Sequence, residues 1–177
     1  MQKNDMAHNR RLRSGLTAAL PLVLMSLAGC GGSSSSNPDP APVSRTGTFG
    51  SSAVSGLHYR TGNAATATTD ARGRFHYTGN QNVTFSIGGL ALGEAPGADK
   101  VTVLSVSGDA VSASEPHVTH KLMLLQTLDA DGDLNNGIQL TEQIRDAISA
   151  NAGDLSFDQP TADFTAALEN VVTDLEN

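Results

Sequence analysis

Three aspartates alternate with small residues in the segment Asp129-Ala130-Asp131-Gly132-Asp133. Carboxylates a few ångströms apart repel one another, so this spacing in a loop rich in Gly and Asn is unfavourable unless a cation neutralises it. Hard divalent cations, Ca²⁺ above all, prefer oxygen ligands of this kind. The spacing therefore predicts a structural calcium site in this loop.

One register of the loop is similar to the EF-hand pattern. With Asp131 as the first position, Asp133 is third and Asn135 is fifth. Gly137 is then seventh, where a backbone carbonyl is the usual ligand, and Glu142 is twelfth, where EF-hands place a bidentate glutamate. We expect a helix on each side of the loop, as this pattern requires.

Two alternatives stay open for the same loop. A register that begins at Asp129 is also typical of calcium loops, and it would lose Glu142 as a ligand. The other alternative is an acidic turn between two helices that binds no metal; Asn136 at the sixth position of the first register, where Gly is usual, is a mismatch with the EF-hand. The full set of candidate ligands is Asp129, Asp131, Asp133, Asn135, Gly137 and Glu142.

The other side chains with chemical potential do not indicate an enzyme. His117 and His120 are spaced as neighbours on one helix face and could share a metal, but no third ligand lies nearby and we expect both to be exposed. His58 and His76 alternate with apolar residues, so we expect them on the outer face of a sheet. The chain has no Gly-x-Ser-x-Gly motif, no His-Glu-x-x-His motif and no glycine-rich phosphate loop.

The first thirty residues are typical of an export signal. Four basic residues precede an apolar stretch from Leu16 to Ala28, which is short for a membrane span. The sequence Leu27-Ala28-Gly29-Cys30 follows and resembles the lipobox of bacterial lipoproteins. That resemblance implies cleavage before Cys30, a diacylglyceryl thioether on the sulfur of Cys30, a fatty acid such as palmitate on its new amine, and anchoring in the lipid bilayer. Gly31 in place of Asp implies the outer membrane; an ordinary secretory signal with a chance cysteine is the alternative.

Composition and charge limit the class of the remaining protein. The chain has 177 residues, of which 38% are hydrophobic and 16% charged, which excludes a membrane bundle and a coiled coil. Without residues 1–29 it keeps seven of 11 basic and 17 of 18 acidic residues, a formal charge of −10. Nucleic-acid partners need clustered Lys and Arg and are not expected. With Cys30 as the single cysteine, the fold must be stable without a disulfide.

Residue patterns predict a β-rich α+β fold, an antiparallel β-sandwich followed by a small helical subdomain. Residues 30–45 carry the lipidated cysteine and a flexible Gly/Ser/Pro tether, and residues 46–110 show short alternating strands such as Val83, Phe85 and Ile87 between turns. Residues 111–177 switch to helical periodicity, with helices expected from about Ser114, Thr141 and Pro160.

Two segments resemble known modules of secreted proteins. The Val54-x-Gly56 strand and the Thr69-Asp70-Ala71-Arg72-Gly73-Arg74-Phe75 hairpin are similar to transthyretin-like or CnaB-type β-sandwich modules. The segment "LLQTLDADGD" at residues 124–133, through Asn136-Gly137-Ile138, resembles the end of a module found in proteobacterial surface lipoproteins. That family has no agreed activity and often continues into a larger region, so the chain is expected to be a stand-alone module or a shortened relative.

We therefore expect a cell-envelope lipoprotein that acts as a binding, adhesion or scaffolding module for a protein or surface partner. The alternatives are an accessory domain or remnant of a secreted hydrolase, or a periplasmic chaperone for such an enzyme.

Overall fold

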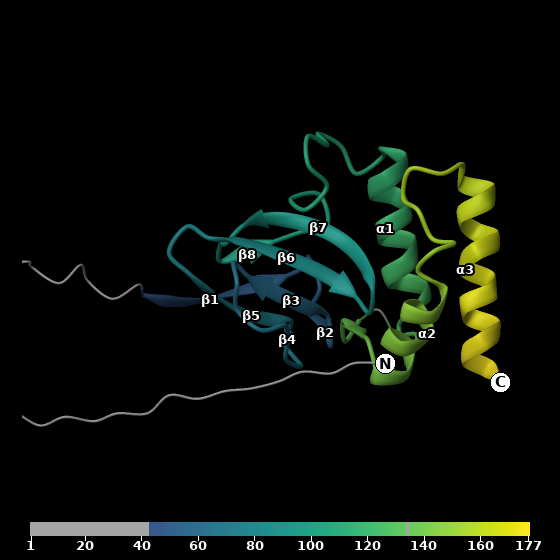
Figure 1. Ribbon diagram of the computed structural model, residues 1–177, viewed down its shortest axis with the longest axis horizontal. Helices are drawn as coiled ribbons and strands as arrows, with labels where there is room; N and C mark the ends of the chain where they lie inside the picture. Colours follow the sequence, from purple (N-terminus) through teal and green to yellow (C-terminus); the bar gives the residue numbers. More distant parts are fainter. Residues whose placement is uncertain (1–42, 134) are drawn as a thin grey trace, which may run out of the picture. The chain divides into compact units, whose positions relative to one another are not determined.

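The computed structural model describes residues 43–133 and 135–177, so Cys30, the signal sequence and residues 30–42 of the expected tether lie outside the described residues. The predicted fold class is confirmed at the coarser level: the chain is mixed α+β, with antiparallel sheets followed by three helices (Figure 1). None of the helices in the described part is long and apolar enough to cross a membrane.

The largest sheet contains four antiparallel strands in the order β4-β3-β6-β7. Burial alternates along β6 (Asn82–Ile87) as the sequence predicts: Val83, Phe85 and Ile87 are buried, and the residues between them are partly exposed. Gly88 closes the β6–β7 turn with a positive φ of 53°, which glycine adopts without a steric penalty. The strands are β3 (His58–Thr61), β4 (Ala67–Thr68), β6 (Asn82–Ile87) and β7 (Leu90–Pro96).

The second sheet has the order β5-β1-β8, in which β1 is antiparallel to β5 and parallel to β8. The turn before β5 forms as predicted, because Oδ1 of Asp70 accepts hydrogen bonds from the backbone N–H groups of Arg72 and Arg74, both at 2.9 Å. The hydrogen bond from the N–H of Arg74 has the largest effect on this carboxylate, and together the bonds lower the pKa of Asp70 to about 2. The strands are β1 (Ser44–Phe49), which begins two residues before the predicted Thr46, β5 (Arg74–Thr78) and β8 (Lys100–Val101).

Aromatic side chains from the two sheets meet in one core. The ring centroids of Phe49 and Phe85 are 4.6 Å apart, and those of Phe75 and Phe85 are 5.1 Å apart in an edge-to-face arrangement. All three side chains are fully buried. Aromatic pairs at this separation stabilise a core beyond the effect of their buried area.

A third, two-stranded sheet connects the strand-rich and helical parts of the chain. β2 (Val54–Ser55) pairs in parallel with β9 (Ile138–Gln139), which lies beyond the Asp-rich loop in the sequence. The N–H of Ile138 donates to the carbonyl of Ala53 at 2.8 Å. Buried residues of both parts belong to one continuous hydrophobic core.

The three helices begin where the sequence predicts. Pro116 occupies the first turn of α1, and Thr141 caps α2 by accepting the N–H of Ile144 at 3.3 Å. Figure 1 shows the helices together at one end of the strands, with α3 outermost, and the apolar face of α3 packs inward through Phe164 and Leu168. The helices are α1 (Pro116–Thr127), α2 (Glu142–Asn151) and α3 (Thr161–Glu176).

Candidate functional site

The Asp-rich loop runs from the end of α1 to β9 and is closed at its base by Gln139. The N–H of Ala130 donates to the carbonyl of Gln139 at 3.1 Å. The backbone N–H of Gln139 donates to Oδ1 of Asp129 at 2.9 Å, and its side-chain Nε2 donates to Oδ2 of Asp131. One residue of β9 therefore contacts both of the first two predicted calcium ligands.

Asp129 is the buried member of the acidic set. Its side chain is only 9% exposed, while Asp131 and Asp133 are exposed. Oδ1 is occupied by Gln139, but Oδ2 has no hydrogen-bond partner among the described residues. A buried carboxylate oxygen without a partner costs several kcal/mol if the group is charged, so this atom requires an explanation.

Asp131 and Asp133 stabilise the loop through turns that use their own side chains. Oδ1 of Asp131 accepts the N–H of Asp133 at 3.0 Å, and its Oδ2 accepts the side-chain amide of Asn136 at 2.8 Å. The first of these bonds is the main reason that the pKa of Asp131 lies below its usual value. Oδ1 of Asp133 accepts both the N–H and the side-chain amide of Asn135. These hydrogen bonds fix the conformation of the loop.

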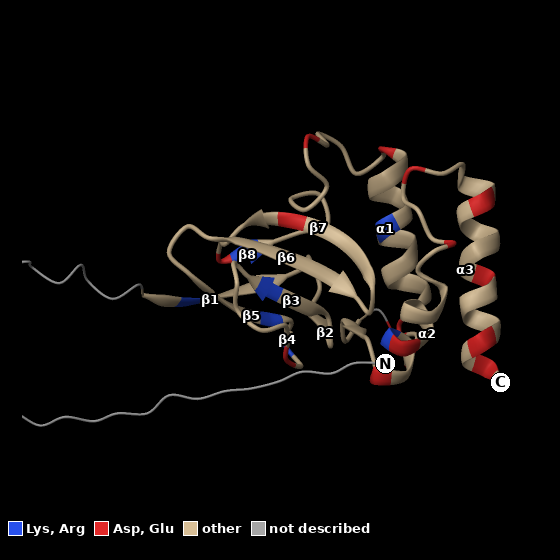
Figure 2. Cartoon of the chain, in the orientation of Figure 1, with Lys and Arg blue, Asp and Glu red and all other residues tan. Residues whose placement is uncertain are grey.

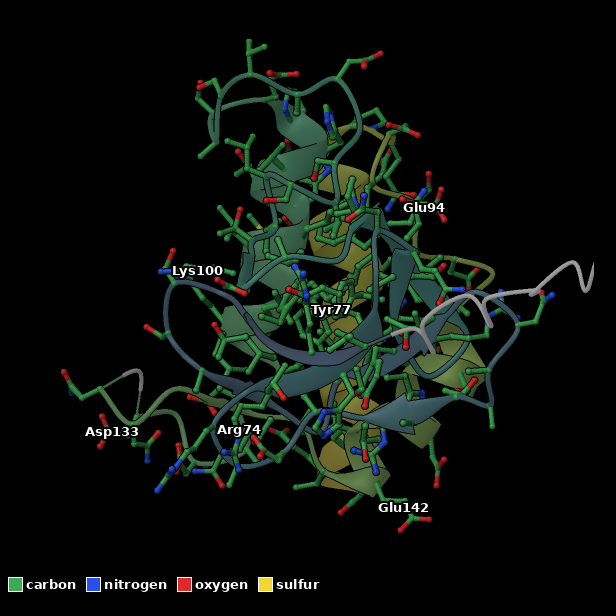
Figure 3. All side chains as sticks on the ribbon, turned by 90° about the vertical axis from the view of Figure 1, so that its left-hand side faces the viewer. Arg74, Tyr77, Glu94, Lys100, Asp133 and Glu142 are labelled. Carbon is green, nitrogen blue, oxygen red and sulfur yellow. The ribbon has the colours of Figure 1, made fainter. Side chains whose placement is uncertain are left out.

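The structure does not bring Glu142 to the other predicted ligands. Glu142 is exposed as the first residue of α2, and Figure 3 shows its side chain and that of Asp133 well separated and directed away from each other. Gly137 is buried with a φ of +103° against the carbonyl of Ala53, where a side chain would collide. Among the described residues, no group of three or more His, Cys, Asp or Glu side chains is placed to hold a metal ion.

The two parts of the chain differ in charge. Residues 43–110 hold five basic and four acidic residues, whereas residues 111–177 hold two basic and 12 acidic ones. Figure 2 shows this division, with Lys and Arg mostly on the strands and Asp and Glu on the helices and loops. Both cations of the helical part are engaged by the protein: Lys121 is buried, and Nη1 of Arg145 donates to the carbonyls of Gly56 and Leu140. The helical part therefore attracts cations.

An apolar cavity of about 380 Å³ lies between the strands and α1. Its lining comes from the segments after β1 and β8, from β2, from α1 and the segment before it, and from β9, and none of the lining residues is charged. A cavity of this size and character is typical of a binding site for a small apolar group. Its apolar lining includes Val54, Val103, Leu104, Leu122, Leu125 and Ile138.

The prediction that His120 is exposed is wrong. Its side chain is fully buried, and its ring stacks on Phe164 with centroids 4.5 Å apart. Nδ1 contacts the carbonyl of Phe157 at 2.8 Å and Nε2 contacts the hydroxyl of Thr161 at 3.0 Å. Both ring nitrogens therefore bind α3 and the segment before it. These two contacts account for the burial of His120 without a metal ion. His117 is half-buried, while His76 is exposed as expected and His58 is partly buried.

The adjacent Lys121 is a buried charge that the sequence pattern does not reveal. Its Nζ donates to Oγ of Ser107 at 3.0 Å and lies 5.4 Å from the ring centroid of Phe157. Burial lowers the pKa of Lys121, and Asp158 opposes that effect. Because the Ser107 hydroxyl donates to the carbonyl of Val103 at 2.7 Å, the pair ties α1 to the loop after β8.

No family model matches the chain, and neither a curated protein nor a solved structure does. The resemblances to the lipobox and to the sandwich modules therefore stay predictions.

Substitution of Lys121 by Met is expected to remove a pH dependence of stability. The folded state binds the Lys121 proton less tightly than the unfolded state, so wild-type stability should rise relative to Lys121→Met as the pH approaches 10.5. At pH 7 the lost hydrogen bonds and the relieved desolvation oppose each other, which leaves a difference within about 1 kcal/mol. Urea unfolding from pH 7 to 10.5 measures this, with the exposed Lys100→Met as control. A difference between wild type and Lys121→Met that does not change with pH would contradict the assignment.

Proposed function

We propose that this chain is a lipoprotein of the cell envelope, anchored to the outer membrane through acylated Cys30, that acts as a binding, adhesion or scaffolding module rather than as an enzyme. The lipobox-like sequence supports the anchor. The aromatic contacts between the two larger sheets support a sandwich-type β module.

The uncharged cavity beside α1 is the observation that carries the binding role. Its volume of about 380 Å³ suits an apolar side chain or a short acyl or aromatic group of a partner. Thr102 and Gln126 on its wall offer polar atoms that would orient such a group. The partner proposed is therefore a protein or surface that presents one apolar anchor.

The difference in charge between residues 43–110 and residues 111–177 supports one orientation of this module relative to the bilayer. The tether would join the chain at β1, in the part that carries five basic and four acidic residues. Anionic headgroups repel the helical part, where nearly all of the excess negative charge lies. The helices and the cavity beside α1 would then face away from the bilayer.

The same acidic part supports a structural calcium ion in the Asp-rich loop. Of the predicted ligands, Asp129 and Asp131 both accept a hydrogen bond from Gln139, and residues 111–177, which contain them, hold 12 acidic and two basic residues. Bound Ca²⁺ would stabilise the folded state by mass action.

A periplasmic chaperone or accessory domain for a secreted hydrolase is the second candidate. Such a role needs an apolar surface for a folding intermediate, and the cavity beside α1 favours it. An increase in the refolding yield of a lipase in the presence of this chain would separate the chaperone from a simple binding module.

Replacement of Cys30 by Ser is expected to abolish lipid attachment. The thioether needs a sulfur, and Cys30 is the only cysteine in the chain. Metabolic labelling with an alkyne palmitate analogue should mark the wild-type protein and a Ser34→Ala control in the membrane fraction, and should leave Cys30→Ser unlabelled. Wild-type protein that is released from the envelope without label would contradict the anchor.

Replacement of Leu122 by Trp is expected to block the cavity. The larger side chain would fill space that the apolar group occupies, so affinity for the neutral fluorescent probe N-phenylnaphthylamine should fall at least about tenfold, or about 1.4 kcal/mol. Leu175→Trp is the matched control, because Leu175 is also half-buried but does not line this cavity. Equal probe binding by both variants and by wild type would refute the assignment of the cavity.

A further inference from the structure

The cavity beside α1 contains no charge that could balance a charged ligand. None of its lining residues is Asp, Glu, Lys, Arg or His, and its polar side chains are those of serine, threonine and glutamine. Lys121 is the one Lys or Arg of α1, but it does not line the cavity, because its Nζ donates to Oγ of Ser107 and to the carbonyl of Val106. Transfer of an unpaired carboxylate or sulfonate into such a site is strongly unfavourable.

The volume of the cavity limits the size of the group that fills it. An apolar cavity of about 150 Å³ binds benzene, and the cavity beside α1, at about 380 Å³, is about 2.5 times as large. It therefore suits about two linked rings or an alkyl chain of about eight carbons. Its walls are aliphatic, with Val103 and Leu104 from the strand-rich part facing Leu125 of α1.

Gln126 is the lining side chain best placed to bind the polar end of such a ligand. It lies one helical turn after Leu122, which also lines the cavity, and it is exposed, so it marks the side on which the cavity meets solvent. Its amide carries both donors and an acceptor, as the hydroxyl or amide end of a ligand does. The hydroxyl of Thr102, by contrast, already accepts the N–H of Ser105 at 3.3 Å and lies 3.0 Å from its Oγ.

We propose that the cavity binds an uncharged apolar ligand whose hydroxyl or amide end bonds Gln126, and that it excludes carboxylates and sulfonates. This inference rests on the binding role proposed for the cavity and names the chemical class of the ligand. The charge of the helical part acts in the same direction, because its 12 acidic and two basic residues repel anions. A medium-chain alcohol fits this site, and the fatty-acid anion of the same length does not.

Photolabelling of the full chain in detergent tests the ligand class, with diazirine-bearing octanol and diazirine-bearing octanoic acid as the two probes. At pH 8 the octanoic acid is ionised and the octanol is not. Tandem mass spectrometry then identifies the labelled residues. We expect octanol to label Leu122 and Leu125 in the wild-type protein, and octanoate to label them at least about tenfold less, because its charge would be buried without a partner.

Replacement of Gln126 by Arg supplies a cation to the cavity. Because Gln126 is exposed, the fold should persist, and octanoate labelling of Leu122 and Leu125 should rise at least about tenfold through a charge-assisted hydrogen bond. The matched control is Gln143→Arg, which makes the same change of charge at an exposed glutamine of α2 that does not line this cavity. It should label with octanoate as weakly as wild type.

The outcomes separate this inference from the binding role on which it rests. Equal labelling of the cavity by both probes in wild type, or equal octanoate labelling in the two Arg variants, would overturn the ligand class while leaving the cavity as a binding site. A wild-type protein whose cavity residues are not labelled by octanol would overturn the binding role, and the ligand class with it.

Discussion

The parallel pairing of β9 with β2 ties the helical part of the chain to the strands. These strands are 83 residues apart in the sequence, yet the N–H of Ile138 donates to Ala53 and the N–H of Leu140 donates to Ser55. Arg145 adds a bond from α2 to the carbonyl of Gly56 at 3.0 Å. Because of this junction, the Asp-rich loop returns to the strands, α2 starts beside them, and Ile138 completes the wall of the apolar cavity.

Local patterns were sufficient to predict the longer strands and the three helices. Alternation predicted Val83, Phe85 and Ile87 in a half-buried strand, and the 3.6-residue period predicted a helix from about Pro160, where α3 lies. These features depend on neighbours within a few residues, so the sequence displays them directly. The hairpin at Asp70 belongs to the same class, because its hydrogen bonds connect residues at most four positions apart.

Features that depend on distant contacts were not predictable. The burial of His120 requires Phe157, Thr161 and Phe164, which lie about forty residues later in the chain. β9 contains only two residues, which is too few for the alternation of a strand to be visible in the sequence. For the candidate site, the sequence identified the acidic loop but left its register open, because only the fold separates Glu142 from Asp133 and buries Asp129.

The module combines an acidic helical part, a buried carboxylate and an apolar cavity. The Asp-rich loop connects the helix that lines the cavity to the strand that completes it. A cation at Asp129 would therefore stabilise the junction as well as the loop.

Hydrogen exchange at the two amides that join residues 138–140 to the segment around β2 measures whether a cation in the loop stabilises this junction. The amides of Ile138 and Leu140 should exchange at least about tenfold more slowly in saturating Ca²⁺ than in chelator, because the proposed ion would hold the loop that positions them. Exchange at these two amides that does not differ between Ca²⁺ and chelator would contradict a stabilising cation in the Asp-rich loop.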